Sequence, residues 1–198
     1  MNKRKGSLFI ITGPSGAGKG SVLSRVLPSL ENVFLSVSAT TRKPRPGEED
    51  GVNYYFISRE RFDEMVERGE LLEHAKYVGN CYGTPEGPVN RRLEDGQDVI
   101  LEIEVQGALI VKEKRPDAVL VFIVPPSFDI LERRLRNRGT EAEEVVEKRL
   151  QKARAECAHM DDYDFIVVND LLDDAVRDLS AIITAERCRS SKNQIKLV

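Results

Sequence analysis

The residues with the clearest chemical potential lie near the N-terminus, where residues 13–20 read G-P-S-G-A-G-K-G. Glycines at this density let successive backbone N–H groups turn toward one anion. An apolar run at residues 8–11 precedes the segment, and a helical pattern over residues 18–27 follows it. A strand, a glycine-rich turn and a helix start predict a P-loop, in which the helix N-terminus and Lys19 hold the phosphates of a nucleotide.

One position departs from the strict P-loop pattern. The residue after Lys19 is Gly20 instead of the serine or threonine that reaches a metal ion, and the first hydroxyl comes at Ser21. G-K-G followed by a hydroxyl residue resembles the loop of nucleoside monophosphate kinases more than that of GTPases or motor ATPases. A glycine-rich turn with an incidental lysine is the alternative, which the flanking strand and helix disfavour. The predicted nucleotide-binding residues here are Gly13, Pro14, Ser15, Gly16, Ala17, Gly18, Lys19, Gly20 and Ser21.

Length and composition limit the classes of protein that fit. The 198 residues suit one domain, and 40% hydrophobic with 32% charged residues is typical of a soluble chain with a core. The 30 basic and 33 acidic residues give a net charge of −3, which disfavours a protein that coats nucleic acid. We therefore expect no nucleic-acid partner. Because no segment resembles a signal peptide or approaches the length of a membrane span, we also expect no membrane partner.

Cysteine usage bears on the compartment. The three cysteines, Cys81, Cys157 and Cys188, are far apart and form no C-x-x-C pair. This pattern predicts neither a disulfide framework nor a zinc site, and we expect a cytoplasmic protein.

Apolar runs and helical patterns alternate along most of the chain. This order predicts an α/β fold in which helices cover both faces of a parallel sheet. We expect strands at residues 8–11, 33–37, 99–105, 119–124 and 165–168. We expect helices at residues 18–27, 59–68, 85–94, 105–114, 127–138, 141–158 and 172–188.

Two segments interrupt the alternation. Residues 38–92 are more polar and richer in turn residues, which predicts an inserted small subdomain. Residues 137–140 read N-R-G-T between two helical patterns. Gly139 fits a helix C-cap, and Thr140 with Glu143 fits a capping box, so we expect a hinge here.

Two groups of charged residues could bind phosphate or metal. Arg42 and Arg45 lie on a loop that prolines stiffen, and two guanidinium groups suit a phosphate, although basic loops are often only solvated. Glu102 and Glu104 are two positions apart on a predicted strand, so we expect them to share one face near its carboxyl end. Open parallel sheets bind ligands at that end, whereas solvated edge charges are the alternative.

Several segments together are similar to those of guanylate kinases. They are S-V-S-A-T-T-R-K-P-R-P-G-E at residues 36–48, G-V-N-Y-Y-F at 51–56, L-L-E-H-A at 71–75, G-N-C-Y-G-T at 79–84 and V-V-N-D at 167–170. The resemblance runs from the P-loop to about residue 188. It implies a P-loop NTPase core with a parallel five-stranded sheet, a GMP-binding insert and a short lid. The implied single domain covers residues 5–187, with its core at 5–37 and 93–187, the insert at about 38–92, the lid at about 136–150, and a tail at 188–198.

The resemblance also implies an activity, the Mg²⁺-dependent transfer of the γ-phosphoryl group of ATP to GMP and also to dGMP. Thr84 stands where the family usually has serine, and Glu102 and Glu104 stand where it usually has aspartate. The implied GMP-binding residues are Ser38, Arg42, Arg45, Tyr54, Glu73, Tyr82, Thr84 and Glu104. The implied catalytic residues are Lys19, Arg42, Arg134, Arg138 and Arg149, with Asn169 near the adenine of ATP and with Ser21 and Glu102 near the metal through water.

Within this resemblance, Glu73 selects the base. Guanine presents its N1–H and 2-amino donors side by side, and one carboxylate can accept both, whereas adenine has no such pair. An adenine in the pocket would leave the carboxylate unpaired, at a cost of about 1–3 kcal/mol or more. Without the resemblance, Glu73 would be expected on the surface, as most glutamates are.

The implied reaction needs little acid–base chemistry. The second pKa of a phosphate ester is about 6, so the attacking oxygen is mostly deprotonated at pH 7 and no general base is expected. We therefore expect His74 and His159 to be structural or incidental, and we expect the insert and hinge to close over the substrates. Two alternatives remain. A scaffold module that binds a phosphopeptide is disfavoured by the intact P-loop, and a kinase for another monophosphate is disfavoured by Glu73.

Overall fold

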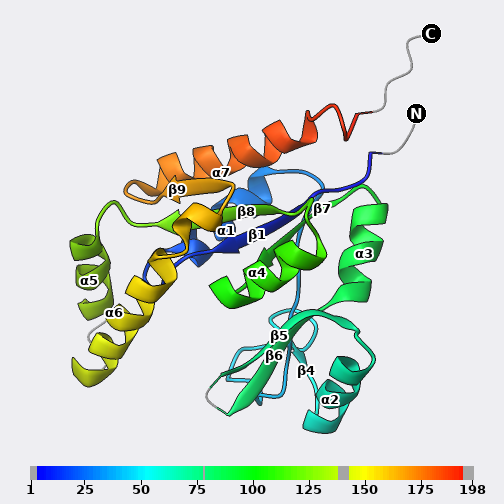
Figure 1. Ribbon diagram of the computed structural model, residues 1–198, viewed down its shortest axis with the longest axis horizontal. Coiled ribbons are helices and arrows are strands. Elements are labelled where there is room, and N and C mark those ends of the chain that lie inside the picture. Colours follow the sequence, from blue (N-terminus) through cyan, green and yellow to red (C-terminus); the bar gives the residue numbers. More distant parts are fainter. Residues whose placement is uncertain (1–3, 78, 138–142, 194–198) are drawn as a thin grey trace.

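A computed structural model describes residues 4–77, 79–137 and 143–193 of this chain, and a five-stranded sheet lies at its centre (Figure 1). The order of the strands is β2-β7-β1-β8-β9, and every neighbouring pair is parallel. The predicted α/β fold around a parallel sheet is therefore confirmed. The strands are β1 (Leu8–Thr12), β2 (Val33–Leu35), β7 (Asp98–Glu102), β8 (Val119–Val124) and β9 (Phe165–Val168).

Helices cover both faces of this sheet. In the central strand β1, Phe9 and Ile11 pack in one buried cluster, which includes residues of α1 (Lys19–Val26) and α7 (Leu172–Arg187). The alternate residues Leu8 and Ile10 pack in a second cluster with α3 (Glu86–Glu94) and α4 (Val105–Lys114). Because successive side chains point to opposite faces, the four apolar residues in a row at residues 8–11 bury β1 on both sides.

A second sheet lies below the main sheet in Figure 1 and has the strand order β4-β3-β6-β5. The helix α2 (Arg59–Glu67) packs against it, where Phe62 and Met65 meet Leu71 and Cys81. Ser58 caps this helix by accepting a hydrogen bond from the N–H of Arg61. The strands of this second sheet are β3 (Ala39–Thr40), β4 (Tyr55–Phe56), β5 (Leu71–Tyr77) and β6 (Asn80–Pro85).

The two sheets share buried contacts. The last residue of β6, Pro85, is followed at once by the first residue of α3, Glu86. Leu72 of β5 is buried in the same cluster as Leu93 of α3 and residues of β1. The ammonium of Lys114, at the end of α4, donates to the carbonyl oxygen of Leu72 at 2.8 Å. The second sheet is therefore anchored to the main core at its base.

Two further helices, α5 (Phe128–Arg136) and α6 (Glu143–Cys157), project from one end of the main sheet (Figure 1). They pack on each other through a separate apolar cluster that includes Leu131, Leu135 and Leu150. Arg138 and the predicted hinge residues Gly139 and Thr140 lie outside the described residues. The remaining elements are the short helices η1 (Leu27–Ser29) and η2 (Met160–Asp162).

Asp98 ties the two ends of the described chain to the main sheet. This carboxylate is fully buried at the start of β7. It accepts hydrogen bonds from the N–H of Ser7 at 2.8 Å, from Arg4 Nη2 at 2.9 Å and from Arg187 Nε at 2.7 Å. A buried carboxylate with this many donors is compensated for its loss of water.

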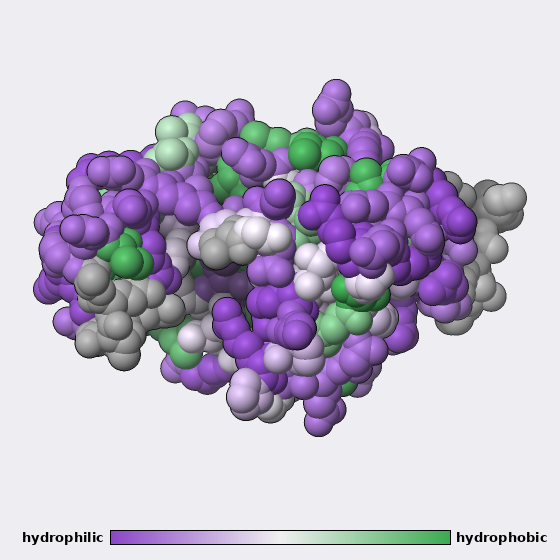
Figure 2. Space-filling view, turned by 90° about the horizontal axis from the view of Figure 1, so that it is seen from below, coloured by the Kyte–Doolittle hydropathy of each residue, from purple (hydrophilic) through white to green (hydrophobic). Residues whose placement is uncertain are grey.

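The face seen from below in Figure 2 is largely hydrophilic and is hollowed near its middle. Among the described residues, no helix combines the length and the apolar character that a membrane crossing requires.

Candidate active site

The P-loop connects the end of β1 to the start of α1, as the sequence predicts. Gly13 has φ 143° and Gly18 has φ 86°. A Cβ at Gly13 would lie 2.0 Å from the carbonyl oxygen of Ile123, and a Cβ at Gly18 would lie 2.4 Å from Asn169 Nδ2. Both positions therefore require glycine for conformation and for space. Because α1 begins at Lys19, its first N–H groups open onto the loop.

The Lys19 side chain folds back over the P-loop. Its Nζ donates to the carbonyl oxygen of Gly13 at 2.6 Å and to that of Pro14 at 3.4 Å. Burial lowers the pKa of Lys19, and the nearby Glu102 carboxylate acts in the opposite direction. The carbonyl acceptors are neutral, so these bonds orient the ammonium without cancelling its charge.

Two of the predicted arginines contact the loop or its neighbours. Arg149 Nη2, on α6, donates to Ser15 Oγ at 2.6 Å. Arg134 Nη2, on α5, donates to the carbonyl oxygen of Asn169 at 3.0 Å, and Asn169 Nδ2 donates to that of Ala17 at 2.7 Å. The structure thus brings together residues from three separate segments around one loop. Arg138 falls among the residues that the structure does not describe.

An open cavity of about 340 Å³ adjoins this side of the loop. It is lined by Gly16 and Gly18 of the P-loop, by the predicted residues Ser21, Arg134 and Asn169, and by Asp170 and Leu172. One side of the P-loop and one arginine, Arg134, line this cavity, so it suits part of a nucleotide.

A second cavity, of about 330 Å³, lies between the second sheet and the carboxyl end of β7. Its lining comes from both sheets and from the start of α4. Six of the residues that the sequence singled out line it, namely Ser38, Tyr54, Glu73, Tyr82, Glu102 and Glu104. We call this cavity the acceptor pocket.

Glu73 lines the acceptor pocket and is buried, with only 6% of its surface exposed. Its Oε1 accepts a hydrogen bond from Thr84 Oγ1 at 2.6 Å. A Cβ at Gly107 would lie 3.0 Å from Glu73 Oε2, so α4 passes close to the second carboxylate oxygen. Burial raises the pKa of Glu73, against the effect of the Thr84 hydrogen bond. The alternative of an ordinary surface glutamate is wrong.

The arginine loop is held by an acid that the sequence analysis did not identify. Glu48 forms a two-pronged ion pair with Arg42, in which Nη1 and Nη2 each donate at 2.9 Å. The backbone N–H of Arg45 donates to the same carboxylate at 2.7 Å. The Arg42 guanidinium also lies 5.5 Å from the ring centre of Tyr54, one of the residues lining the acceptor pocket. These contacts place Arg42 beside Tyr54, next to that pocket.

Glu102 and Glu104 do not share a strand face, so that prediction is wrong. The strand β7 ends at Glu102, and Glu104 has left the sheet to become the N-cap of α4, where its carbonyl accepts from the N–H of Ala108. Glu104 Oε1 accepts from Lys152 Nζ at 2.8 Å. Burial raises the pKa of Glu102, partly offset by Lys19. Both acids still line the acceptor pocket.

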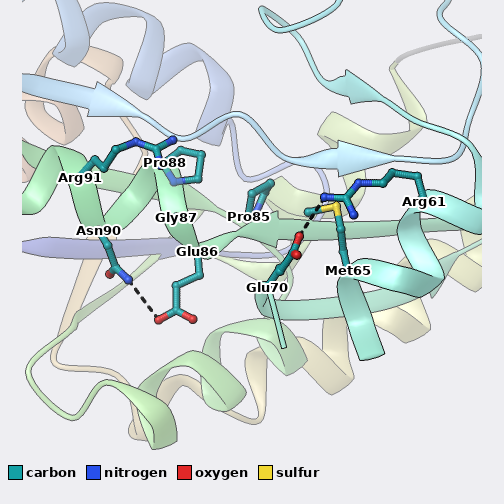
Figure 3. Close-up of a pocket in the computed structure, with 9 residues that line it drawn as sticks. All are labelled: Arg61, Met65, Glu70, Pro85, Glu86, Gly87, Pro88, Asn90 and Arg91. Carbon is teal, nitrogen blue, oxygen red and sulfur yellow. Dashed lines mark hydrogen bonds and ion pairs between the residues drawn. The ribbon is translucent and has the colours of Figure 1, made fainter. Parts of the chain in front are cut away.

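A third cavity, of about 520 Å³, lies between α2 and the start of α3 and is shown in Figure 3. There Arg61 points to Glu70, whose Oε2 it contacts at 2.9 Å. Glu86 Oε1 accepts from Asn90 and, at 2.9 Å, from Arg115. None of the predicted site residues lines this cavity, and its acids are already paired, so we place the chemistry in the other two.

Comparison with known proteins agrees with these features. A family model described as guanylate kinase matches residues 5–186. The chain belongs to the guanylate kinase family. A guanylate kinase of Desulfitobacterium hafniense is 52% identical over 189 residues, which cover 96% of this chain and 94% of the relative. A guanylate kinase of Thermus thermophilus is also 52% identical, over 97% of this chain and 86% of the relative. The crystal structure of a guanylate kinase from Anaplasma phagocytophilum matches with a TM-score of 0.77 and 33% identity, over 97% of this chain and 92% of that one.

The structure of this guanylate kinase family member adds residues that the motifs did not reveal. On α6, Lys152 and Glu156 follow Arg149 by three and seven positions, a spacing that places all three on one side of a helix. That spacing could have indicated a polar face directed toward the site. Glu48 and Gly107 lie close to predicted residues only through folding, and nothing in their local sequence marks them.

Proposed function

We propose that this member of the guanylate kinase family transfers the γ-phosphoryl group of ATP to GMP, and also to dGMP, and releases ADP with the diphosphate. One observation carries the proposal. A buried carboxylate, Glu73, lines a pocket whose wall extends to Glu102, and Glu102 pairs with Ile11 of β1, the strand that leads into the P-loop. A pocket suited to a guanine base thus adjoins a loop suited to a triphosphate.

On the donor side, we propose that ATP places its phosphates in the P-loop. The loop N–H groups and Lys19 bind the outer phosphates, while Arg149 approaches the loop from α6. The cavity beside Gly18 then takes the rest of the nucleotide, with Asn169 near the adenine.

On the acceptor side, we propose that GMP enters the acceptor pocket with its base against Glu73. Thr84 already occupies one acceptor site of Glu73 Oε1, and the remaining lone pairs accept the N1–H and 2-amino donors of guanine. Ser38 and Glu104 line the same pocket and supply further base contacts. We propose that Arg42, Arg45, Tyr54 and Tyr82 bind the phosphate at the pocket mouth.

The chain then has two tasks, to align two phosphates and to offset their repulsion. No group is needed to remove a proton, because the attacking phosphate oxygen is already mostly ionised at pH 7. Lys19, Arg45, Arg134 and Arg149 supply positive charge from the loop, the acceptor side and both projecting helices. Arg42 adds its charge when the phosphate takes the place of Glu48 as its partner. Removal of one such contact is expected to cost on the order of 10²- to 10³-fold in rate.

A Mg²⁺ ion fits the donors near the P-loop. Among the described residues, no cluster of three or more His, Cys, Asp or Glu side chains could hold a metal alone. Mg²⁺ in phosphoryl transfer usually keeps several waters and takes one or two protein oxygens besides the phosphates, which Ser21 and Glu102 can provide. When bound, the ion would neutralise charge on the transferring phosphoryl group.

We further propose that one domain, residues 5–187, does this work, with a GMP-binding insert at about 38–92 and a lid at about 136–150. The core segments are 5–37 and 93–187, and 188–198 is a tail. Closure of the insert and the lid would exclude water from the reacting phosphates. The cytoplasm, which holds both nucleotides, is the proposed site of action.

The test is a coupled ADP-release assay with GMP, dGMP, AMP, UMP and dTMP side by side. Turnover with the two guanine nucleotides alone supports the proposal, and turnover with any other monophosphate in their place identifies a different kinase. Binding of a fluorescent ATP analogue separates both from a phosphopeptide scaffold, which should bind no ATP. Lys19→Met is the matched control, because it should remove turnover while GMP still binds.

A further inference from the structure

One ammonium group joins three elements around the acceptor pocket. Lys152 Nζ, on α6, lies 2.8 Å from Glu104 Oε1 at the N-cap of α4 and 3.7 Å from Glu156 Oε1 on its own helix. It also lies 5.1 Å from the ring centre of Tyr77, the last residue of β5. Both Glu104 and Tyr77 line the acceptor pocket.

The same helix, α6, also contacts the P-loop, which we call the donor loop because it is proposed to bind the phosphate donor ATP. Arg149 comes three positions before Lys152, and it donates to Ser15 of the P-loop at 2.6 Å. The opposite side of α6 is fixed to α5 through buried residues such as Leu150. One helix therefore contacts the donor loop through Arg149 and the acceptor pocket through Lys152, about one turn later.

We propose that Lys152 is a positioning residue that couples closure over the acceptor nucleotide to the placement of Arg149 on the donor loop. This inference rests on the function proposed above. Lys152 holds the Glu104 carboxylate at the edge of the acceptor pocket and draws the end of β5 toward α6. When it does so, the helix that carries Arg149 is fixed in the position that contacts Ser15.

The contacts of Lys152 with Glu104 and Tyr77 are weak enough to form and break in every turnover. The side chains of Lys152 and Glu104 are 42% and 59% exposed, so water competes for both charges. Exposed ion pairs and exposed cation–π contacts are individually weak. Together they favour the closed arrangement without preventing product release.

The first test replaces Lys152 with methionine, which keeps the length and the apolar stem but removes the charge. For Lys152→Met we expect the KM for GMP to rise on the order of 3- to 30-fold, as the loss of two weak contacts predicts. The KM for ATP should stay within about twofold, because Lys19 and the P-loop still bind the phosphates. The kcat should fall several-fold, because Arg149 is no longer held against Ser15, and an unchanged kcat would overturn the coupling to Arg149. Lys152→Arg should restore most of the GMP affinity, since arginine can also pair with a carboxylate and lie over a ring. Lys148→Met, at an exposed lysine on the same helix, is the matched control and should behave as wild type.

The second test measures coupling across the pocket. If Tyr77 acts through the ammonium, the double variant Lys152→Met/Tyr77→Leu should have nearly the same KM for GMP as Lys152→Met alone. The difference between wild type and Lys152→Met should also shrink as NaCl is raised, because salt screens an exposed ion pair. Independent, multiplying effects of the two substitutions would overturn the coupling.

The outcomes separate this inference from the proposed function. Absence of GDP formation by the wild-type protein would refute the function itself. Normal wild-type turnover, with Lys152→Met within about twofold of wild type for GMP or with Lys148→Met showing the same defect, would overturn only the role of Lys152.

Discussion

Replacement of Glu73 by glutamine should separate GMP binding from ATP binding. Glutamine keeps the size of the side chain and the carbonyl oxygen that accepts from Thr84 Oγ1 at 2.6 Å in the wild type. It replaces the second oxygen, beside Gly107, with an NH₂ group. That group would point a donor at a donor of guanine.

The size of the effect follows from the two donors of the base. Loss of one charge-assisted hydrogen bond costs about 1.5–3 kcal/mol, and an unpaired buried donor adds about 1–3 kcal/mol. The total of about 2.5–6 kcal/mol corresponds to an increase on the order of 10²- to 10⁴-fold in the Kd for GMP. ATP binding should hold, because the P-loop contacts of Lys19 do not involve Glu73.

The same substitution should stabilise the free protein at neutral pH. Burial raises the pKa of Glu73, so the folded state keeps the proton to a higher pH than the unfolded chain does. Stability is therefore lost as pH rises from the unfolded pKa through the folded one, and glutamine has no such dependence. The Tm of Glu73→Gln should exceed that of wild type at pH 8, and the difference should shrink toward pH 4.

Isothermal titration with GMP and with a nonhydrolysable ATP analogue, together with thermal melts at several pH values, measures these effects. Unchanged GMP affinity in Glu73→Gln would remove Glu73 from the base site. A variant that loses affinity for both nucleotides would indicate general damage instead. A Tm below that of wild type at pH 8 would contradict the cost assigned to the buried carboxylate.

Three further perturbations test other contacts. Gly107→Ala places a Cβ 3.0 Å from Glu73 Oε2, so the KM for GMP should rise on the order of tenfold with little change in the KM for ATP. Steady-state kinetics measure both values, and an unchanged KM for GMP would contradict this prediction. Arg149→Lys should lower kcat on the order of 10²-fold, because a point charge replaces the fork that reaches Ser15; single-turnover rates equal to wild type would exclude Arg149 from catalysis. Asp98→Ala leaves two arginines without their buried partner, so unfolding in urea should show a loss of about 3–5 kcal/mol with normal kcat in the folded fraction, and a loss below about 1 kcal/mol would contradict this.

The parts of the fold that the sequence predicts are those with local signals. The strand at 8–11, the glycine-rich turn and the helix after it are all encoded within one short segment, and the structure forms them in that order. Helix α4 begins at Val105, as its pattern predicts. The strand before it was predicted too long, since the run V-I-L-E-I-E-V keeps an apolar alternation past the residue where the backbone leaves the sheet.

The acceptor pocket was less predictable from local sequence. Glu73 meets Thr84 across the paired strands β5 and β6, and its burial depends on α4 packing beside it. No pattern around L-L-E-H-A encodes that burial, so only the resemblance to guanylate kinases singled it out. The ion pair of Lys152 with Glu104 spans 48 positions in the chain, and such partners are chosen by tertiary packing.

The embedding of Leu72 beneath the main sheet limits how this molecule can be re-engineered. The base of the second sheet contributes to the buried cluster that contains Leu93 and Leu120. The strands of this sheet therefore cannot be exchanged without disturbing the main core. Grafting the corresponding strands from a kinase of different base preference would leave a void at that junction unless α3 and the neighbouring part of α4 were transplanted with them. Base preference in this chain is therefore expected to evolve by single changes within the existing pocket rather than by exchange of modules.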